Sequence, residues 1–244
     1  MKIVKEHFLN YKNLYIYQDK NSFCYGLDAV LLGNFINITA SQKRILDLGT
    51  GNLPIPLILY SKYKKEIDCV ELQEEVCLLG KKTLKENSLE DMIHLYCEDI
   101  RNLKNVFKPN SYDVISINPP YFTNGKNSGK VLKALSRHEL SISLDEILKI
   151  VSYLLTNKGH FYMIHRTERF LEIVDCLKKY NLSPKRVSFV HSKVNSKSKL
   201  FLIDCIKDGK SGLIIDSPIV IYSGDKYSKE FNRMLGDISD TKEL

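Results

Sequence analysis

The chain has 244 residues, 43% of them hydrophobic, which is enough for one large α/β domain with its own core. It contains no apolar run near the roughly 20 residues that a membrane-spanning helix requires, and its N-terminus is not that of a signal peptide. We therefore expect a cytoplasmic protein with no membrane contact. The formal net charge of +7 favours a partner that carries phosphate groups.

The cysteines are scattered along the chain and include no Cys-x-x-Cys pair. They are Cys24, Cys69, Cys77, Cys97, Cys176 and Cys205. Several lie in apolar runs, which is typical of buried thiols in a cytosolic protein. We therefore expect no zinc site and no other metal.

Residues 1–22 are polar and aromatic and are expected to form an N-terminal extension. The alternation of side chains in Leu14–Tyr17 predicts a short strand within it. An apolar run that begins near Tyr25 predicts a helix, which Asp28 could cap. A cap alone is one interpretation of Asp28, and a place in a binding site is the other.

The segment 43–52 predicts a strand that runs into a glycine turn. Asp47 ends the strand, and Gly49 and Gly51 would let a ligand approach the backbone closely. A helix over residues 55–63 is expected next, and its N-terminus offers free N–H groups.

Two further predicted strands lead to acids. The strand 66–71 ends in Glu71, at the position where nucleotide-binding α/β folds hold a ribose diol. The alternative is that Glu71 caps the next helix, at residues 74–86. The strand 93–97 precedes Asp99, which could accept a hydrogen bond from an adenine amino group or could be a solvated turn acid.

The apolar run 112–117 predicts a buried strand that ends in Asn118, Pro119, Pro120 and Tyr121. Each proline fixes φ and lacks an N–H, and a residue before proline is held extended, so the corner is rigid. Ligands bind at this edge of open α/β sheets. The Asn118 oxygen and the Pro119 carbonyl could accept both hydrogens of an NH2 group on a planar substrate, with Tyr121 stacked on its face. A simple turn is the alternative.

The next segment, residues 123–130, is polar, glycine-containing and basic, and predicts a mobile loop. His138 follows it and could be a core, capping or ligand-contacting residue. A helix is expected at residues 144–155.

The last third of the chain completes the predicted sheet. We expect a strand at 159–164, a helix at 167–180, and strands at 185–191 and 200–206, which form a closing antiparallel pair. The result is a mixed sheet of seven strands. Residues 213–222 could add an edge strand. A polar C-terminal tail covers about residues 223–244, of which Tyr227–Leu244 is expected to fray.

The succession of strand, glycine turn, two acids and Asn-Pro-Pro-Tyr resembles the class I S-adenosylmethionine-dependent methyltransferases that methylate amino groups. The resemblance covers roughly residues 20 to 206. It implies a single Rossmann-like α/β domain over residues 1–244, with helices on both faces of the sheet, and S-adenosyl-L-methionine as cofactor.

The resemblance also implies two sets of site residues. The cofactor-binding set is Tyr25, Asp28, Asp47, Gly49, Thr50, Gly51, Glu71, Asp99, Ile100 and Asn118. The catalytic set is Asn118, Pro119, Pro120 and Tyr121. Leu53 stands where the family usually has another glycine, and Leu27 where a threonine is common.

Within this class the chain is most similar to the bacterial tRNA adenine-N6 methyltransferases that modify the adenosine 3′ of the anticodon in a valine tRNA. The similarity is carried by Tyr25–Leu32, by Asn118–Phe122 and by Arg137–Glu139. It implies a tRNA substrate. The expected RNA-binding residues are Phe122, Lys126, Lys130, Arg137, Lys193 and Lys197.

Two other functions remain open. A methyltransferase that modifies a glutamine side chain of a protein would use the same tetrapeptide on an amide, although the positive charge argues against it. A catalytically silent fold that binds RNA is the other, against which the acids Asp47, Glu71 and Asp99 argue. The sequence leaves the oligomeric state open, with a monomer favoured.

Overall fold

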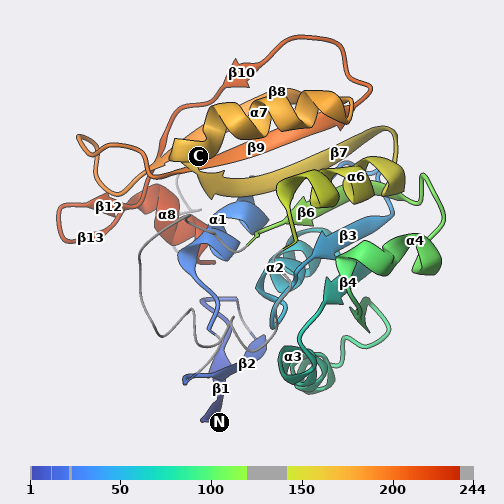
Figure 1. Cartoon of the computed structure of the whole chain (residues 1–244). Coiled ribbons are helices and arrows are strands. Elements are labelled where there is room, and N and C mark those ends of the chain that lie inside the picture. The colour runs from blue at the N-terminus through green and yellow to red at the C-terminus, as the bar shows by residue number, and fades with distance from the viewer. Residues whose placement is uncertain (1, 12, 22–23, 120–141, 237–244) are drawn as a thin grey trace.

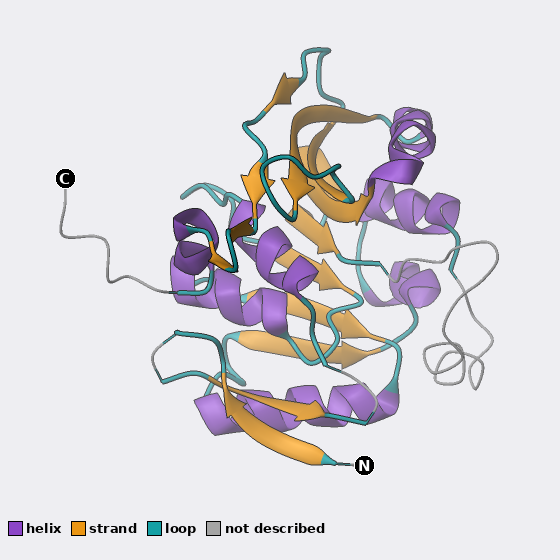
Figure 2. Ribbon diagram, turned by 90° about the vertical axis from the view of Figure 1, so that its left-hand side faces the viewer, coloured by secondary structure: helices purple, strands orange, loops and turns teal. Residues whose placement is uncertain are grey.

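A mixed β-sheet with helices on both faces forms the centre of the protein, whose structure is a computed structural model that describes residues 2–11, 13–21, 24–119 and 142–236 (Figures 1 and 2). Its long strands are β3 (Ile45–Leu48), β4 (Ile67–Glu71), β5 (Ile93–Cys97), β6 (Tyr112–Ile117), β7 (Leu155–Arg166), β8 (Leu182–His191) and β9 (Leu200–Lys207). The short strands β10 (Ile214–Ile215) and β11 (Ile219–Val220) pair with β8 at the edge.

The strand order is β10-β8-β9-β7-β6-β3-β4-β5. Strand β9 is antiparallel to both β7 and β8, whereas β3, β4, β5, β6 and β7 run parallel to one another. The predicted seven-stranded mixed sheet is thus confirmed, as is the additional edge strand. The central strands are buried on both faces, which is why they are continuous apolar runs in the sequence.

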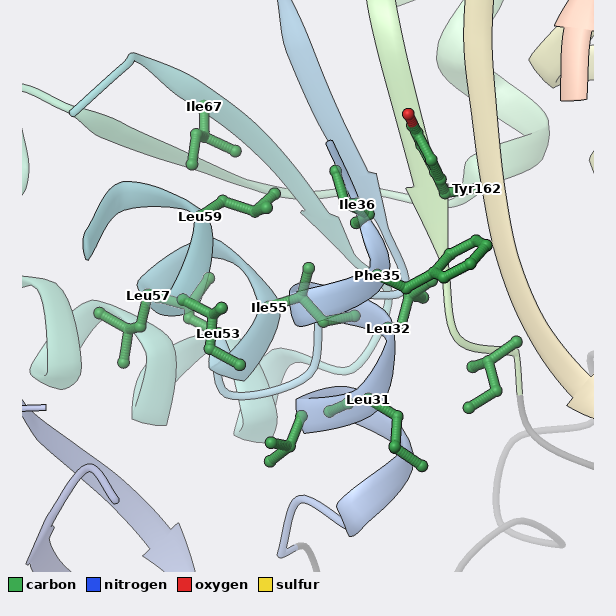
Figure 3. Close-up of a cluster of buried hydrophobic side chains, with 14 of the residues drawn as sticks. Leu31, Leu32, Phe35, Ile36, Leu53, Ile55, Leu57, Leu59, Ile67 and Tyr162 are labelled. Atoms are coloured by element: carbon green, nitrogen blue, oxygen red, sulfur yellow. The ribbon is translucent and has the colours of Figure 1, made fainter. Parts of the chain in front are cut away.

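Helices cover the two faces as separate layers. The helices are α1 (Leu27–Phe35), α2 (Pro54–Tyr63), α3 (Glu74–Asn87), α4 (Leu103–Val106), α6 (Leu144–Leu154), α7 (Phe170–Lys179) and α8 (Lys229–Met234). Apolar side chains of α1, α2 and α3 pack in one core, and those of α4, α6 and α7 in the other. Figure 3 shows part of the first core, in which the Phe35 ring lies edge-on to Tyr162 at 6.1 Å.

A β-hairpin precedes the sheet. Its strands β1 (Ile3–His7) and β2 (Tyr15–Asp19) are antiparallel, and β2 packs on α3 (Figure 1). Phe8 and Ile16 are fully buried in the first core, so the expected N-terminal extension is packed against the sheet domain. The predicted strand near Leu14–Tyr17 is confirmed as β2.

The expectation that the tail frays was wrong for the part that the structure describes. A small antiparallel pair, β12 (Tyr222–Ser223) with β13 (Lys226–Tyr227), leads into α8. Phe231 on α8 is fully buried, and the Asn34 amide donates to the Met234 carbonyl at 2.9 Å. One buried aromatic ring therefore fixes a segment that is polar on average.

The expectation of buried thiols was wrong for three cysteines. Cys77 on α3 and Cys97 at the end of β5 form a disulfide, with their Cα atoms 6.1 Å apart, and Cys24 is exposed. Cys69, Cys176 and Cys205 are buried free thiols, as predicted. Across the described ranges, no helix has the length and apolar character to cross a membrane.

Leu148 on α6 is fully buried, whereas Leu171 on the neighbouring helix α7 is 76% exposed. We expect Leu148→Ala to lower the free energy of unfolding by about 2–5 kcal/mol, because it removes buried carbon and leaves a cavity. Leu171→Ala should change it by less than about 0.5 kcal/mol. Urea titration of both variants checks this, and equal losses would contradict the assignment of α6 to the core.

Candidate functional site

The carboxyl ends of four neighbouring strands meet at one edge of the sheet. In the register, Leu48 of β3 lies between Val70 of β4 and Ile117 of β6, and Glu71 pairs with Cys97 of β5. The residues that follow these strands are therefore neighbours in space. This is the arrangement that the sequence predicted for the glycine turn, the two acids and the Asn118 corner.

The glycine turn after β3 is built from left-handed backbone. Gly49 and Gly51 both have φ of +61°, and Leu53 has φ of +79°. A β-carbon at position 49 would meet no atom within 4 Å, so the Gly49 backbone faces open space. Leu53 adopts a conformation that favours glycine, and its side chain is fully buried in the core (Figure 3).

Glu71 connects β4 to this turn. Its Oε2 accepts the Gly51 N–H at 3.0 Å, and its Oε1 accepts the Gln73 N–H at 2.9 Å. Burial raises the pKa of Glu71, and these backbone hydrogen bonds oppose the rise. Because Gln73 is the residue that precedes α3, Glu71 both supports the start of that helix and holds the glycine turn.

Asp47 lies beneath the turn and is completely buried. Its Oδ1 accepts a hydrogen bond from the Ser116 hydroxyl on β6 at 2.6 Å. Burial raises the pKa of Asp47 to about 7, and the Ser116 hydrogen bond opposes the rise. In the described structure, three buried oxygen atoms have no hydrogen-bond partner, namely Asp47 Oδ2, Thr50 Oγ1 and Asn52 Oδ1. Thr50 and Asn52 belong to the glycine turn, and Asp47 lies on the strand before it, so these polar groups are buried together beside the turn.

Asp99 is paired within the protein. Its carboxylate accepts from the Arg101 backbone N–H at 2.8 Å and from the Arg101 Nε at 3.0 Å. The Arg101 guanidinium lowers the pKa of Asp99. Ile100 begins the short 3₁₀ helix η1 (Ile100–Asn102) and is half-buried. Arg101 was missed in the sequence, although its position two residues after the acid is a signal for this pair.

Asn118 and Pro119 directly follow β6, with Asn118 half-buried and Pro119 buried. Ser116, two residues earlier on the same strand, is the residue that bonds to Asp47. The described residues end here, so several predictions cannot be placed. They concern Pro120, Tyr121, Phe122, Lys126, Lys130, Arg137 and His138, which lie outside the described residues.

The start of α1 lies at the same edge as the glycine turn. The Tyr63 hydroxyl donates to the Ile36 carbonyl at 3.0 Å, which joins the ends of α2 and α1, so both helices begin at that edge. Gly26 occupies the cap position of α1 without a side-chain hydrogen bond, and Asp28 lies in the first turn. The prediction that Asp28 caps the helix was therefore wrong. Burial raises the pKa of Tyr25 to about 12.

Basic residues of the β8–β9 loop lie at the same edge. Strand β9 pairs with β7 so that Leu200 is opposite Arg166, and the Thr167 N–H donates to the Lys199 carbonyl at 3.1 Å. The loop therefore lies beside the end of β7, next to the strand that carries Asn118. Lys193 and Lys197 of this loop are exposed.

The end of β7 adds positive side chains that the sequence analysis missed. Arg166 is half-exposed and forms an ion pair with Glu168, and Arg169 pairs with Glu172. Burial, together with Arg169, lowers the pKa of His165 to about 4, so this imidazole is neutral at pH 7. Among the described residues, no cluster of His, Cys, Asp or Glu has the composition of a metal site.

The chain was compared with known proteins. A family model described as the methyltransferase small domain matches residues 13–179. A tRNA1(Val) (adenine(37)-N6)-methyltransferase from Parabacteroides distasonis is 26% identical over 238 residues, covering 94% of this chain and 96% of the relative. A protein of the same name from Bacteroides fragilis is 28% identical over 200 residues, covering 82% of this chain and 84% of the relative.

Solved structures with the same fold include a predicted O-methyltransferase from Agrobacterium tumefaciens. Its TM-score is 0.68 at 16% identity, covering 86% of this chain and 95% of that chain. Geranyl diphosphate C-methyltransferase from Streptomyces coelicolor, solved with S-adenosyl-L-homocysteine, has a TM-score of 0.56 at 11% identity, covering 74% of this chain and 80% of that chain. At these identities the likeness concerns the fold.

The raised pKa of Asp47 predicts a pH dependence of stability. Its folded-state pKa of about 7 lies above that of an unfolded aspartate, so the native state binds this proton more tightly and loses stability as the pH rises. From pH 5 to pH 8, we expect Asp47→Asn to gain on the order of 2 kcal/mol in free energy of unfolding relative to the ligand-free wild type.

The matched control is Asp113→Asn. Although burial opposes it, hydrogen bonds from the Arg44 and Lys43 backbone lower the pKa of Asp113. The free energy of unfolding of this variant should not increase relative to that of the wild type as the pH rises. Urea titrations at both pH values measure the two differences, and a pH-independent difference for Asp47→Asn would contradict the buried carboxyl.

Proposed function

The chain belongs to the methyltransferase small domain family, and we propose that it transfers a methyl group from S-adenosylmethionine to the exocyclic N6 of an adenosine in tRNA. The nucleotide that we propose is the adenosine at position 37, next to the anticodon of a valine tRNA, as in the names of the relatives. Such a substrate suits the excess of positive charge.

One observation carries the proposal. The glycine turn and the Asn118 corner follow adjacent parallel strands, β3 and β6, and the Ser116–Asp47 hydrogen bond of 2.6 Å joins those strands directly below them. A methyl donor held over the turn would therefore lie beside an amino group held at the corner. Proximity and orientation of this kind are the main requirements of a group transfer.

The cofactor supplies a methyl group activated by a positive sulfonium. We propose that its ribose lies at Glu71, where one carboxylate also fixes the Gly51 backbone. The glycine turn offers an open backbone surface at Gly49. We propose that the Asp99 carboxylate accepts a hydrogen bond from the adenine amino group and keeps its hydrogen bonds to Arg101.

The acceptor amine of adenine is a poor nucleophile, because its lone pair is delocalised into the ring. We propose that the Asn118 oxygen and the Pro119 carbonyl accept its two hydrogens, which favours a pyramidal nitrogen whose lone pair points at the methyl group. The rigid corner holds both acceptors in place before the reaction, so the catalysis is positional and electrostatic. Tyr121 would stack on the base, which is extruded most readily from a loop such as that of the anticodon.

The catalytic role of Asn118 is tested by Asn118→Ala. We expect methyl transfer to a tRNA transcript to fall by about 100- to 1,000-fold, because one preorganised hydrogen-bond acceptor is lost. The affinity for S-adenosylhomocysteine, measured by calorimetry, should fall by less than about tenfold, or 1.4 kcal/mol, because Asn118 is only one member of the expected cofactor-binding set.

Asn87→Ala serves as the control for this experiment, because Asn87 lies at the far end of α3 from the glycine turn. It should retain nearly all of the transfer rate. An Asn118→Ala variant with most of the wild-type activity would refute the catalytic assignment.

Lys193 and Lys197 test the proposed path of the RNA. We expect the double variant Lys193→Gln, Lys197→Gln to weaken tRNA binding. The slope of log Kd against log salt concentration should fall by up to about two, because each phosphate contact contributes roughly one to that slope. The methyl transfer rate at saturating tRNA should change little. Filter binding at several salt concentrations measures the slope.

Lys158 and Lys210 form the matched control pair. Both are exposed, and they flank the ends of β7 and β9 that lie opposite the Asn118 edge. Lys158→Gln, Lys210→Gln should leave the salt dependence almost unchanged. Equal effects of the two pairs would indicate non-specific attraction and not a footprint at the β8–β9 loop.

A further inference from the structure

The glycine turn needs support from outside itself. Three of its residues have left-handed backbone, and one of these is Leu53, which has a β-carbon. A non-glycine residue in this conformation is strained and persists only where surrounding contacts fix it. The Leu53 side chain is buried, but the polar backbone of the turn also requires an anchor.

Asn52, between Gly51 and Leu53, supplies that anchor. It is completely buried, and its Nδ2 donates a hydrogen bond to the Tyr17 carbonyl at 2.8 Å. Tyr17 belongs to β2, so this single side chain ties the turn to the N-terminal hairpin.

The same residue of the hairpin is also held by α3. The Tyr17 N–H donates to the Thr83 hydroxyl of α3 at 3.0 Å, and Thr83 is fully buried. Helix α3 begins just after Glu71, whose carboxylate accepts the Gly51 N–H. The contacts therefore close a circuit from the turn through Glu71, α3 and β2 back to Asn52.

A second amide links the hairpin to the start of α1. Gln18 is buried, its Oε1 accepts the Tyr25 N–H at 3.2 Å, and its Nε2 donates to Glu6 at 2.8 Å. Tyr25 also contacts the Phe8 ring, with a centroid distance of 5.5 Å. The hairpin thus touches both segments that flank the proposed cofactor, namely the glycine turn and Tyr25.

We propose that the β1–β2 hairpin supports the S-adenosylmethionine site. In this proposal Asn52 is a positioning residue that holds the glycine turn in its cofactor-binding conformation. The inference concerns the methyl-donor side of the site alone. It goes beyond the proposed RNA substrate and does not depend on which nucleotide is methylated.

The test is the affinity for S-adenosylhomocysteine, measured by calorimetry without RNA. We expect Asn52→Ala to raise Kd by about tenfold, because the loss of this buried hydrogen bond leaves the turn free to relax. With any RNA that the wild type methylates, KM for S-adenosylmethionine should rise similarly, while kcat at saturating cofactor stays within about twofold, since Asn118 is untouched.

Asn87→Ala is a matched control. The Asn87 side chain bonds to the same strand, because its Nδ2 donates to the Tyr15 carbonyl at 2.8 Å and its Oδ1 accepts the Tyr15 N–H at 2.8 Å. Asn87→Ala removes more hydrogen bonds than Asn52→Ala and should lower the melting temperature at least as much. Only Asn52→Ala should weaken binding, because Thr83 keeps Tyr17 in place in the control.

Asn52→Ser offers a milder truncation in case Asn52→Ala does not fold, and a weakening of several-fold is expected for it. Wild-type affinity in a folded Asn52 variant would overturn the proposal. So would an equal loss of affinity in Asn87→Ala, because the effect would then be one of general stability.

Discussion

The hydrogen bond from Ser116 to Asp47 joins the two strand tips on which the proposed reaction depends. Strand β3 ends in the glycine turn and β6 ends in the Asn118 corner, and their parallel register fixes how far apart those ends lie. The hydrogen bond and the strand register depend on each other. A slip of one residue would turn every side chain of a strand to the opposite face of the sheet and would separate Ser116 from Asp47. In the proposed reaction, the distance between methyl donor and acceptor would thus be set by the sheet.

A protein that needs such a turn must hold it against its own backbone preferences. Here the left-handed Leu53 is offset by burial of its side chain, and the turn is fixed by Glu71 on one side and by Asn52 on the other. Asp47 remains buried below with a raised pKa, so a carboxyl is kept where a positive ligand would stabilise its charged form. Side-chain packing and hydrogen bonds therefore both stabilise the glycine turn, and a buried carboxyl lies directly beneath it.

Much of this could be predicted from the sequence, because apolar runs of strand length and the residues at their ends give the sheet and its binding edge directly. What could not be predicted depends on contacts between distant segments. The amide of Asn52 gives no local sign of its partner Tyr17, and the disulfide joins Cys77 to Cys97 only because α3 packs beside β5. The capping prediction for Asp28 placed the start of α1 two residues late, and one buried ring, Phe231, orders a tail whose composition is polar.

The most direct test of the account is to methylate an unmodified valine tRNA transcript with labelled S-adenosylmethionine and to identify the labelled nucleoside after complete digestion. The account predicts a single product, N6-methyladenosine, located at position 37, and no label when that adenosine is replaced by guanosine. Label in another nucleoside, or label recovered as methylglutamine in a protein and none in RNA, would contradict it.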